Sequence, residues 1–88
     1  MELFVLDGAR MTDRASAHAY IAAVLRFPAW YGGNLDALAD CLGELGPEKM
    51  LILRNSAALA AMGDYGQRLV STLEELSRED GAYSFGIE

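Results

Sequence analysis

The chain has few of the residues that support covalent or metal-centred chemistry, with one cysteine and one histidine among its 88 residues. The single cysteine, Cys41, excludes an internal disulfide, and its spacing offers no metal site. We therefore expect no metal and no cofactor, and we interpret Cys41 as a small packed residue on the flank of a helix.

Long apolar runs are also missing. Only a short apolar stretch, Leu3–Leu6, follows Met1 and Glu2, and no positively charged segment precedes it. This pattern predicts neither a signal peptide nor a membrane span, and the expected location is cytoplasmic.

Basic side chains are scarce as well. Seven Lys and Arg residues stand against 13 Asp and Glu residues, which gives a net charge of −6. This balance disfavours binding to the phosphate backbone of nucleic acids and favours attraction to a basic macromolecule. We expect no nucleic-acid ligand and a cationic partner, although such a charge also keeps small domains soluble.

Recognisable catalytic sets are absent. The only histidine, His18, lies among alanines on an apolar helix face, which favours a structural imidazole over a general base. The Gly32–Asn34 segment lacks the lysine and the glycine spacing of a phosphate loop. Asp36 and Asp40 are an acid pair without the distinct environments that general acid–base catalysis needs. We expect a protein that is not an enzyme.

What the sequence does contain is the pattern of one α/β domain over residues 1–88. A hydrophobic content of 52% suffices for a single core in a chain of this length. Apolar strands separated by pairs of helices predict a three-stranded parallel sheet with four helices, in the order β-α-α-β-α-α-β. The expected elements are a buried strand Leu3–Leu6, a helix capped by Thr12 or Asp13 and running to about Leu25, a helix over 35–43, a buried strand Met50–Leu53, an alanine-rich helix capped by Asn55 or Ser56 and ended by Gly63, a helix capped by Asp64 with Tyr65, Leu69, Leu73 and Leu76 as its apolar stripe, and a strand through Tyr83, Phe85 and Ile87.

The helix expected over 35–43 carries acids on one side. Asn34 is a suitable N-cap, and leucines recur after it at helical spacing. Asp36, Asp40 and Glu44 fall on the opposite strip, and no Lys or Arg occurs between Phe27 and Glu48. Two interpretations remain open, an ordinary solvated face and a surface that binds a cation.

Two aromatic residues precede this helix in a glycine-rich loop. Trp30 and Tyr31 follow Pro28, and the glycines after them leave the backbone accessible. Aromatic rings beside charges are typical of binding hot spots, and core packing is the equally open alternative for each ring.

Residues 28–42, Pro-Ala-Trp-Tyr-Gly-Gly-Asn-Leu-Asp-Ala-Leu-Ala-Asp-Cys-Leu, resemble the signature of barstar-type ribonuclease inhibitors. The resemblance is weaker over the rest of the chain. It implies the same α/β fold and an intracellular inhibitor that forms a one-to-one complex with a ribonuclease through the basic active-site cleft of that enzyme. By resemblance, Asp40 enters the phosphate site, Asp36 is a second charged contact, and Trp30 packs against a catalytic histidine of the target.

The remaining contact positions implied by the resemblance surround these three. They are Tyr31, Gly32, Gly33, Asn34, Ala37, Ala39, Gly43 and Glu44. The chain departs from the family pattern at Gly33, where the best-known member has an acid, at Ala39 and Leu45, where large tryptophans occur, and at Leu76, near the position of an acid that Glu75 or Glu79 could replace. These departures bear on target identity and affinity. The alternatives are an immunity protein against a delivered toxin nuclease and an acidic interaction module without inhibitory activity.

Overall fold

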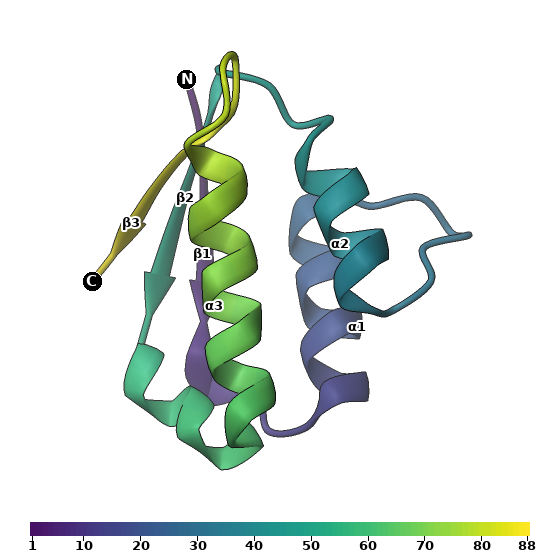
Figure 1. Ribbon diagram of the computed structural model, residues 1–88, viewed down its shortest axis with the longest axis vertical. Coiled ribbons are helices and arrows are strands. Elements are labelled where there is room, and N and C mark those ends of the chain that lie inside the picture. The colour runs from purple at the N-terminus through teal and green to yellow at the C-terminus, as the bar shows by residue number, and fades with distance from the viewer.

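Three short apolar segments form one parallel sheet in the computed structural model, which describes residues 1–88 (Figure 1). The strands are β1 (Glu2–Asp7), β2 (Lys49–Arg54) and β3 (Ser84–Ile87), in the spatial order β1-β2-β3. Leu3 pairs with Met50 between the first two strands. The predicted three-stranded parallel sheet is confirmed.

Four helices of seven or more residues connect the strands, as predicted. They are α1 (Arg14–Leu25), α2 (Leu35–Leu42), η2 (Ser56–Met62) and α3 (Asp64–Ser77), and a short turn, η1 (Gly8–Arg10), follows β1. The alanine-rich segment η2 is a 3₁₀ helix, a geometry common in short connectors. None of the helices is long and apolar enough to cross a membrane.

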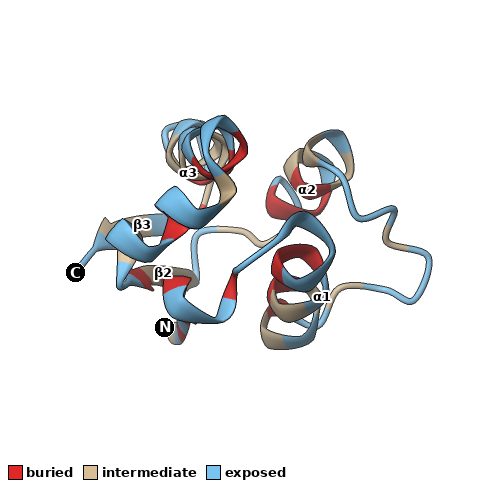
Figure 2. Cartoon of the chain, turned by 90° about the horizontal axis from the view of Figure 1, so that it is seen from below, coloured by how far each residue is buried: buried red, intermediate tan, exposed pale blue.

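The helices α1, α2 and α3 lie on one side of the sheet, and η2 lies at the end of the sheet where β2 ends (Figures 1 and 2). Right-handed crossovers between parallel strands that advance in one direction place both connections on the same face. Phe4 and Leu6 are therefore buried, whereas Leu3 is 61% and Val5 36% exposed. The prediction that the whole Leu3–Leu6 segment is buried is wrong, because no helix covers the second face of β1.

One predicted cap is also wrong, and a second lacks a capping hydrogen bond. Asp64 is the first residue of α3, and the N-cap is Gly63, whose φ of 58° turns the chain out of η2. Asn55 is the N-cap residue of η2, in agreement with the prediction, but its side chain makes no capping hydrogen bond. Its side-chain amide donates instead to Asp7 Oδ1 at 2.9 Å. That bond joins the ends of β1 and β2. Asp13 caps α1 as predicted, accepting from the Ser16 amide.

Candidate functional site

The orientation of α2 follows from its cap and its leucines. Asn34 Oδ1 accepts a hydrogen bond from the Ala37 amide at 2.8 Å, which satisfies one free donor of the first turn. Leu38 and Leu42 are fully buried against the core. Leu35 and Leu45 pack at its edge, so the predicted leucine stripe is confirmed. The other side of α2 must then face solvent.

The exposed side of α2 carries the acidic strip, which we define as Asp36, Asp40 and Glu44. All three residues are exposed, as predicted. None of them belongs to an ion pair, since the four ion pairs of the chain involve Glu2, Glu74 and Glu88. The carboxylates of the acidic strip therefore have no cationic partner within the protein.

Two of these acids occupy positions that disfavour a negative charge. Asp40 lies in the last turn of α2, which ends at Leu42, one residue earlier than predicted, and Glu44 follows the C-cap Gly43. The C-terminal end of a helix carries a partial negative charge, and no basic residue occurs in this turn. A local conflict of this kind is typical of residues that are kept for function.

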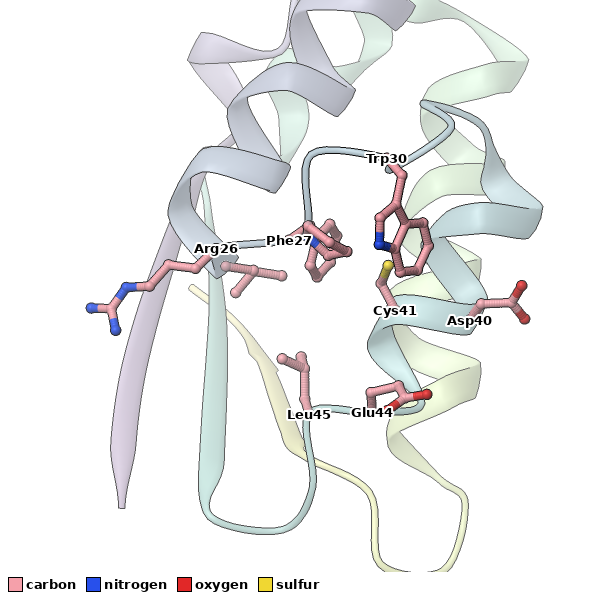
Figure 3. A pocket seen from close by; sticks show the side chains of 9 residues that line it. Arg26, Phe27, Trp30, Asp40, Cys41, Glu44 and Leu45 are labelled. Atoms are coloured by element: carbon pink, nitrogen blue, oxygen red, sulfur yellow. The ribbon is translucent and has the colours of Figure 1, made fainter.

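A pocket of about 300 Å³ opens between α2 and the loop before it, and we call it the tryptophan pocket. Its lining consists of Leu25, Arg26, Phe27, Pro28, Trp30, Asp40, Cys41, Glu44 and Leu45. Figure 3 shows the Trp30 indole close to Cys41, with Asp40 projecting outward beside it. The Arg26 side chain points away, toward Glu2 at 3.7 Å. The pocket thus combines an aromatic wall with two unpaired carboxylates.

The neighbouring aromatic residue, Tyr31, points inward. Its hydroxyl oxygen lies 2.6 Å from His18 Nδ1, and the Tyr65 hydroxyl oxygen lies 2.5 Å from His18 Nε2. A neutral imidazole suits this arrangement because one ring nitrogen donates and the other accepts. Burial lowers the pKa of His18 and raises that of Tyr31. The predicted structural role of His18 is confirmed, and its bonds tie the loop to α1 and α3.

Cys41 is buried beneath the tryptophan pocket, with 8% of its surface exposed. Burial raises the pKa of its thiol, and the nearby Asp40 and Glu44 carboxylates raise it further. A thiol that resists ionisation is a poor nucleophile. The predicted role of Cys41 as a packed residue is confirmed.

The other predicted contact residues lie on the loop and on α2, around the acidic strip. Gly32, Gly33, Asn34 and Gly43 are exposed, and Ala37 and Ala39 are half-buried. Leu76 packs against the core, whereas Glu75 and Glu79 are exposed and do not line the tryptophan pocket.

One hollow, beside Gly33 at the start of α2, is not predicted by the sequence. It brings Arg14 of α1 and Arg68 of α3 beside Asn34 and Asp36. No local pattern could reveal this meeting, because the two arginines are far apart in the chain and only the packing of α1 and α3 brings them together.

Comparison with known proteins covers nearly the whole chain. Residues 1–87 match the family described as "Barstar (barnase inhibitor)". The chain is also 31% identical over 81 residues to a protein of Bacillus subtilis (strain 168) named "Putative ribonuclease inhibitor YrdF", and the match covers 90% of this chain and 89% of that protein. Both matches include the aromatic loop and α2.

Proposed function

The chain belongs to the barstar family, and we propose that it inhibits a ribonuclease by placing the acidic strip and Trp30 in the active-site cleft of that enzyme. One observation carries the proposal. Asp40 and Glu44 are exposed without a cationic partner beside an indole that is 79% exposed. Unpaired carboxylates beside an open aromatic face are a suitable receptor for cationic side chains.

The physical basis is mimicry of the substrate. A ribonuclease holds an anionic phosphodiester with Arg, Lys and His side chains, and a carboxylate can accept the same charge-assisted hydrogen bonds. Asp40 is the residue that we place in the phosphate site, with Asp36 at the edge of the cleft. A carboxylate has no scissile phosphodiester bond. The complex therefore fills the active site without turnover.

Trp30 supplies the apolar part of the contact. Its ring can lie against an imidazole or a guanidinium of the target, which adds aromatic and cation–π interactions to the ion pairs. Tyr31, Gly32, Gly33, Asn34, Ala37, Ala39, Gly43 and Glu44 complete the proposed interface around Trp30, Asp36 and Asp40.

The interface is held in place before binding. The hydrogen bonds between His18 and the hydroxyls of Tyr31 and Tyr65 hold the loop, and the Asn34 cap and Leu38 hold α2. Side chains on a rigid support lose less conformational freedom on association, so more of the contact energy contributes to affinity. This supports a complex that forms without refolding of the inhibitor.

The decisive experiment uses the chain as bait for the secreted and toxin ribonucleases of its source organism. An RNA-cleavage assay on each captured enzyme is expected to show complete inhibition at one equivalent. Asp40→Asn is expected to weaken binding by about 2–5 kcal/mol, because it leaves buried cations of the nuclease unpaired. Glu48→Gln is the matched control, since Glu48 is exposed, forms no ion pair and lies outside the tryptophan pocket.

Three other outcomes would contradict the proposal in different ways. Capture of an enzyme that keeps its full activity would favour a non-inhibitory interaction module. RNA cleavage by the chain itself, lost in Asp40→Asn, would favour an enzyme. Equal effects of Asp40→Asn and Glu48→Gln would exclude the acidic strip from the interface. A fourth outcome, capture of a toxin nuclease with loss of its activity, would agree with the proposal and would identify the chain as an immunity protein.

A further inference from the structure

A second hollow, of about 280 Å³, lies beside the loop at the start of α2. We call it the arginine hollow. Its lining consists of Arg14, Gly33, Asn34, Leu35, Asp36, Tyr65 and Arg68. Gly33, Asn34 and Asp36 also belong to the proposed interface, so the two surfaces are continuous.

Both arginines of the hollow lack an ion-pair partner. Arg26, Lys49, Arg54 and Arg78 pair with carboxylates elsewhere in the chain. Arg14 and Arg68 do not, although Asp36 lines the same hollow. Two unpaired guanidinium groups therefore gather at one point on a chain with a net charge of −6.

Tyr65 serves as the platform for both groups. The Arg14 Cζ atom lies 4.3 Å from the centre of the Tyr65 ring, and the Arg68 Cζ atom lies 5.9 Å from it. The ring itself is buried and its hydroxyl is bonded to His18. A guanidinium that rests on a fixed ring is already partly ordered, and its N–H groups remain free to bind a planar anion.

We propose that Arg14 and Arg68 bind a carboxylate side chain, Asp or Glu, at the rim of the active-site cleft of the target ribonuclease. The inference rests on the proposed function, because it assumes that the acidic strip enters that cleft. A singly charged carboxylate fits the hollow better than a phosphate group, since Asp36 adds a negative charge to the same lining. Bidentate binding by arginine also matches the carboxylate geometry.

The consequence is a mixed charge pattern that selects the target. The acidic strip requires cations in the cleft, and the arginine hollow requires an acid at one side of it. A ribonuclease with a lysine or arginine at that rim position would be repelled even if its active site were otherwise suitable. Arg14 and Arg68 are thus specificity-determining residues for the inhibitor.

The test measures the Kd of two inhibitor variants, R14Q/R68Q and R10Q, for the ribonuclease that the unmodified chain inhibits. Arg10 is the matched control because it is exposed, has no ion pair and lies over a different ring, that of Tyr20 at 5.1 Å. We expect R14Q/R68Q to raise Kd about 10- to 100-fold and R10Q to change it less than threefold. Urea unfolding establishes that each variant is folded.

A set of ribonuclease variants, each with one acidic rim residue changed to its amide, identifies the partner. For one of these ribonuclease variants, R14Q/R68Q is expected to bind as tightly as the unmodified inhibitor does. A charge swap is then expected to restore binding, with R14E/R68E in the inhibitor and lysine at the identified position of the ribonuclease. If R14Q/R68Q binds every ribonuclease variant like the parent inhibitor while D40N fails, the inference is overturned and the proposed function stands. An equal loss against every ribonuclease variant overturns it too. Absence of any inhibition by the unmodified chain overturns both.

Discussion

Trp30 and Tyr31 are adjacent residues with opposite environments. Trp30 is 79% exposed at the edge of the tryptophan pocket, whereas Tyr31 is bonded to a buried histidine. The loop therefore carries one exposed ring, which we propose contacts the partner, and one ring whose hydroxyl anchors the loop to the core. This division gives a direct test of which residue serves the interface.

Trp30→Ala is expected to weaken binding of the target ribonuclease by about 2 kcal/mol or more, as loss of an aromatic hot spot does. Its free energy of unfolding is expected to change by less than about 0.5 kcal/mol, because the indole is exposed. Isothermal titration measures the first quantity and urea unfolding the second.

Tyr31→Phe is the complementary variant. It removes only the hydroxyl that satisfies His18 Nδ1, so we expect a loss of about 1–3 kcal/mol of stability and a smaller loss of affinity. If Trp30→Ala destabilised the fold as much as Tyr31→Phe, the indole would be a structural residue and the proposed contact would be wrong.

His18 predicts a pH dependence of stability. Burial lowers its pKa in the folded state below the usual value of about 6.5, so below that pH the unfolded chain binds a proton that the folded chain does not. The contribution of His18 to the unfolding free energy is therefore expected to be constant above about pH 7. It then falls by up to about 1.4 kcal/mol per pH unit as the pH drops through 6.5 toward the pKa of folded His18.

The single histidine makes this prediction easy to isolate. Urea unfolding at pH 7.5, 6.5 and 5.5 measures the slope, and NMR titration of the imidazole measures its pKa. His18→Gln, which keeps hydrogen-bonding capacity without titrating, is expected to remove most of the slope. An imidazole pKa above 6.5 in the folded protein would reverse the sign and contradict the burial argument.

At the scale of single elements, α2 has one face that packs in the core and one exposed face that we propose binds the target. Leu38, on the inner face, is fully buried. Asp40, on the outer face, lies near the negative end of the helix dipole. The inner face stabilises the fold, whereas the acid near the C-terminus weakly destabilises it. Substitutions on the two faces are expected to have opposite effects.

Leu38→Ala is expected to lower the unfolding free energy by about 2–5 kcal/mol through lost burial and a cavity. Asp40→Asn is expected to raise it slightly, by about 0.3–1 kcal/mol at low salt, because it relieves the unfavourable interaction with the dipole. Urea unfolding of both variants and titration with the ribonuclease check the pair. A stabilised Asp40→Asn that no longer binds would show directly that stability and binding compete in α2.

At the scale of the whole molecule, the charge distribution predicts how fast the complex forms. The chain carries a charge of −6, and its acidic strip has no internal cation. We expect the association rate with a basic cleft to fall at least tenfold between about 10 mM and 500 mM salt, as the Debye length shrinks from roughly 30 Å to roughly 4 Å.

Stopped-flow measurements over this salt range check the steering. The triple variant D36N/D40N/E44Q is expected to associate slowly at low salt and to respond weakly to added salt, whereas Glu48→Gln keeps most of the response. An association rate of the unmodified chain that is indifferent to salt would indicate an apolar interface outside the cleft.

The sequence by itself determined the order of the elements, the parallel sheet, the Asn34 cap and the exposure of the acidic strip. The elements, the cap and the exposed strip depend on local geometry, because helical periodicity, caps and strand signals involve residues within a few positions of one another. The parallel pairing follows from the order of the elements, since helices connect consecutive strands. The signature in residues 28–42 likewise indicated the family that the comparison of the whole chain confirmed.

Tertiary structure decided the features that depend on distant residues. Tyr31 turns inward because His18, 13 residues away, bonds its hydroxyl, and Tyr65 completes that contact from 47 residues beyond His18. The open face of β1 and the meeting of Arg14 with Arg68 also follow from how the helices pack. Spacing along a chain does not specify which elements will touch, so burial and charge pairing between elements become visible only once the fold has brought them together.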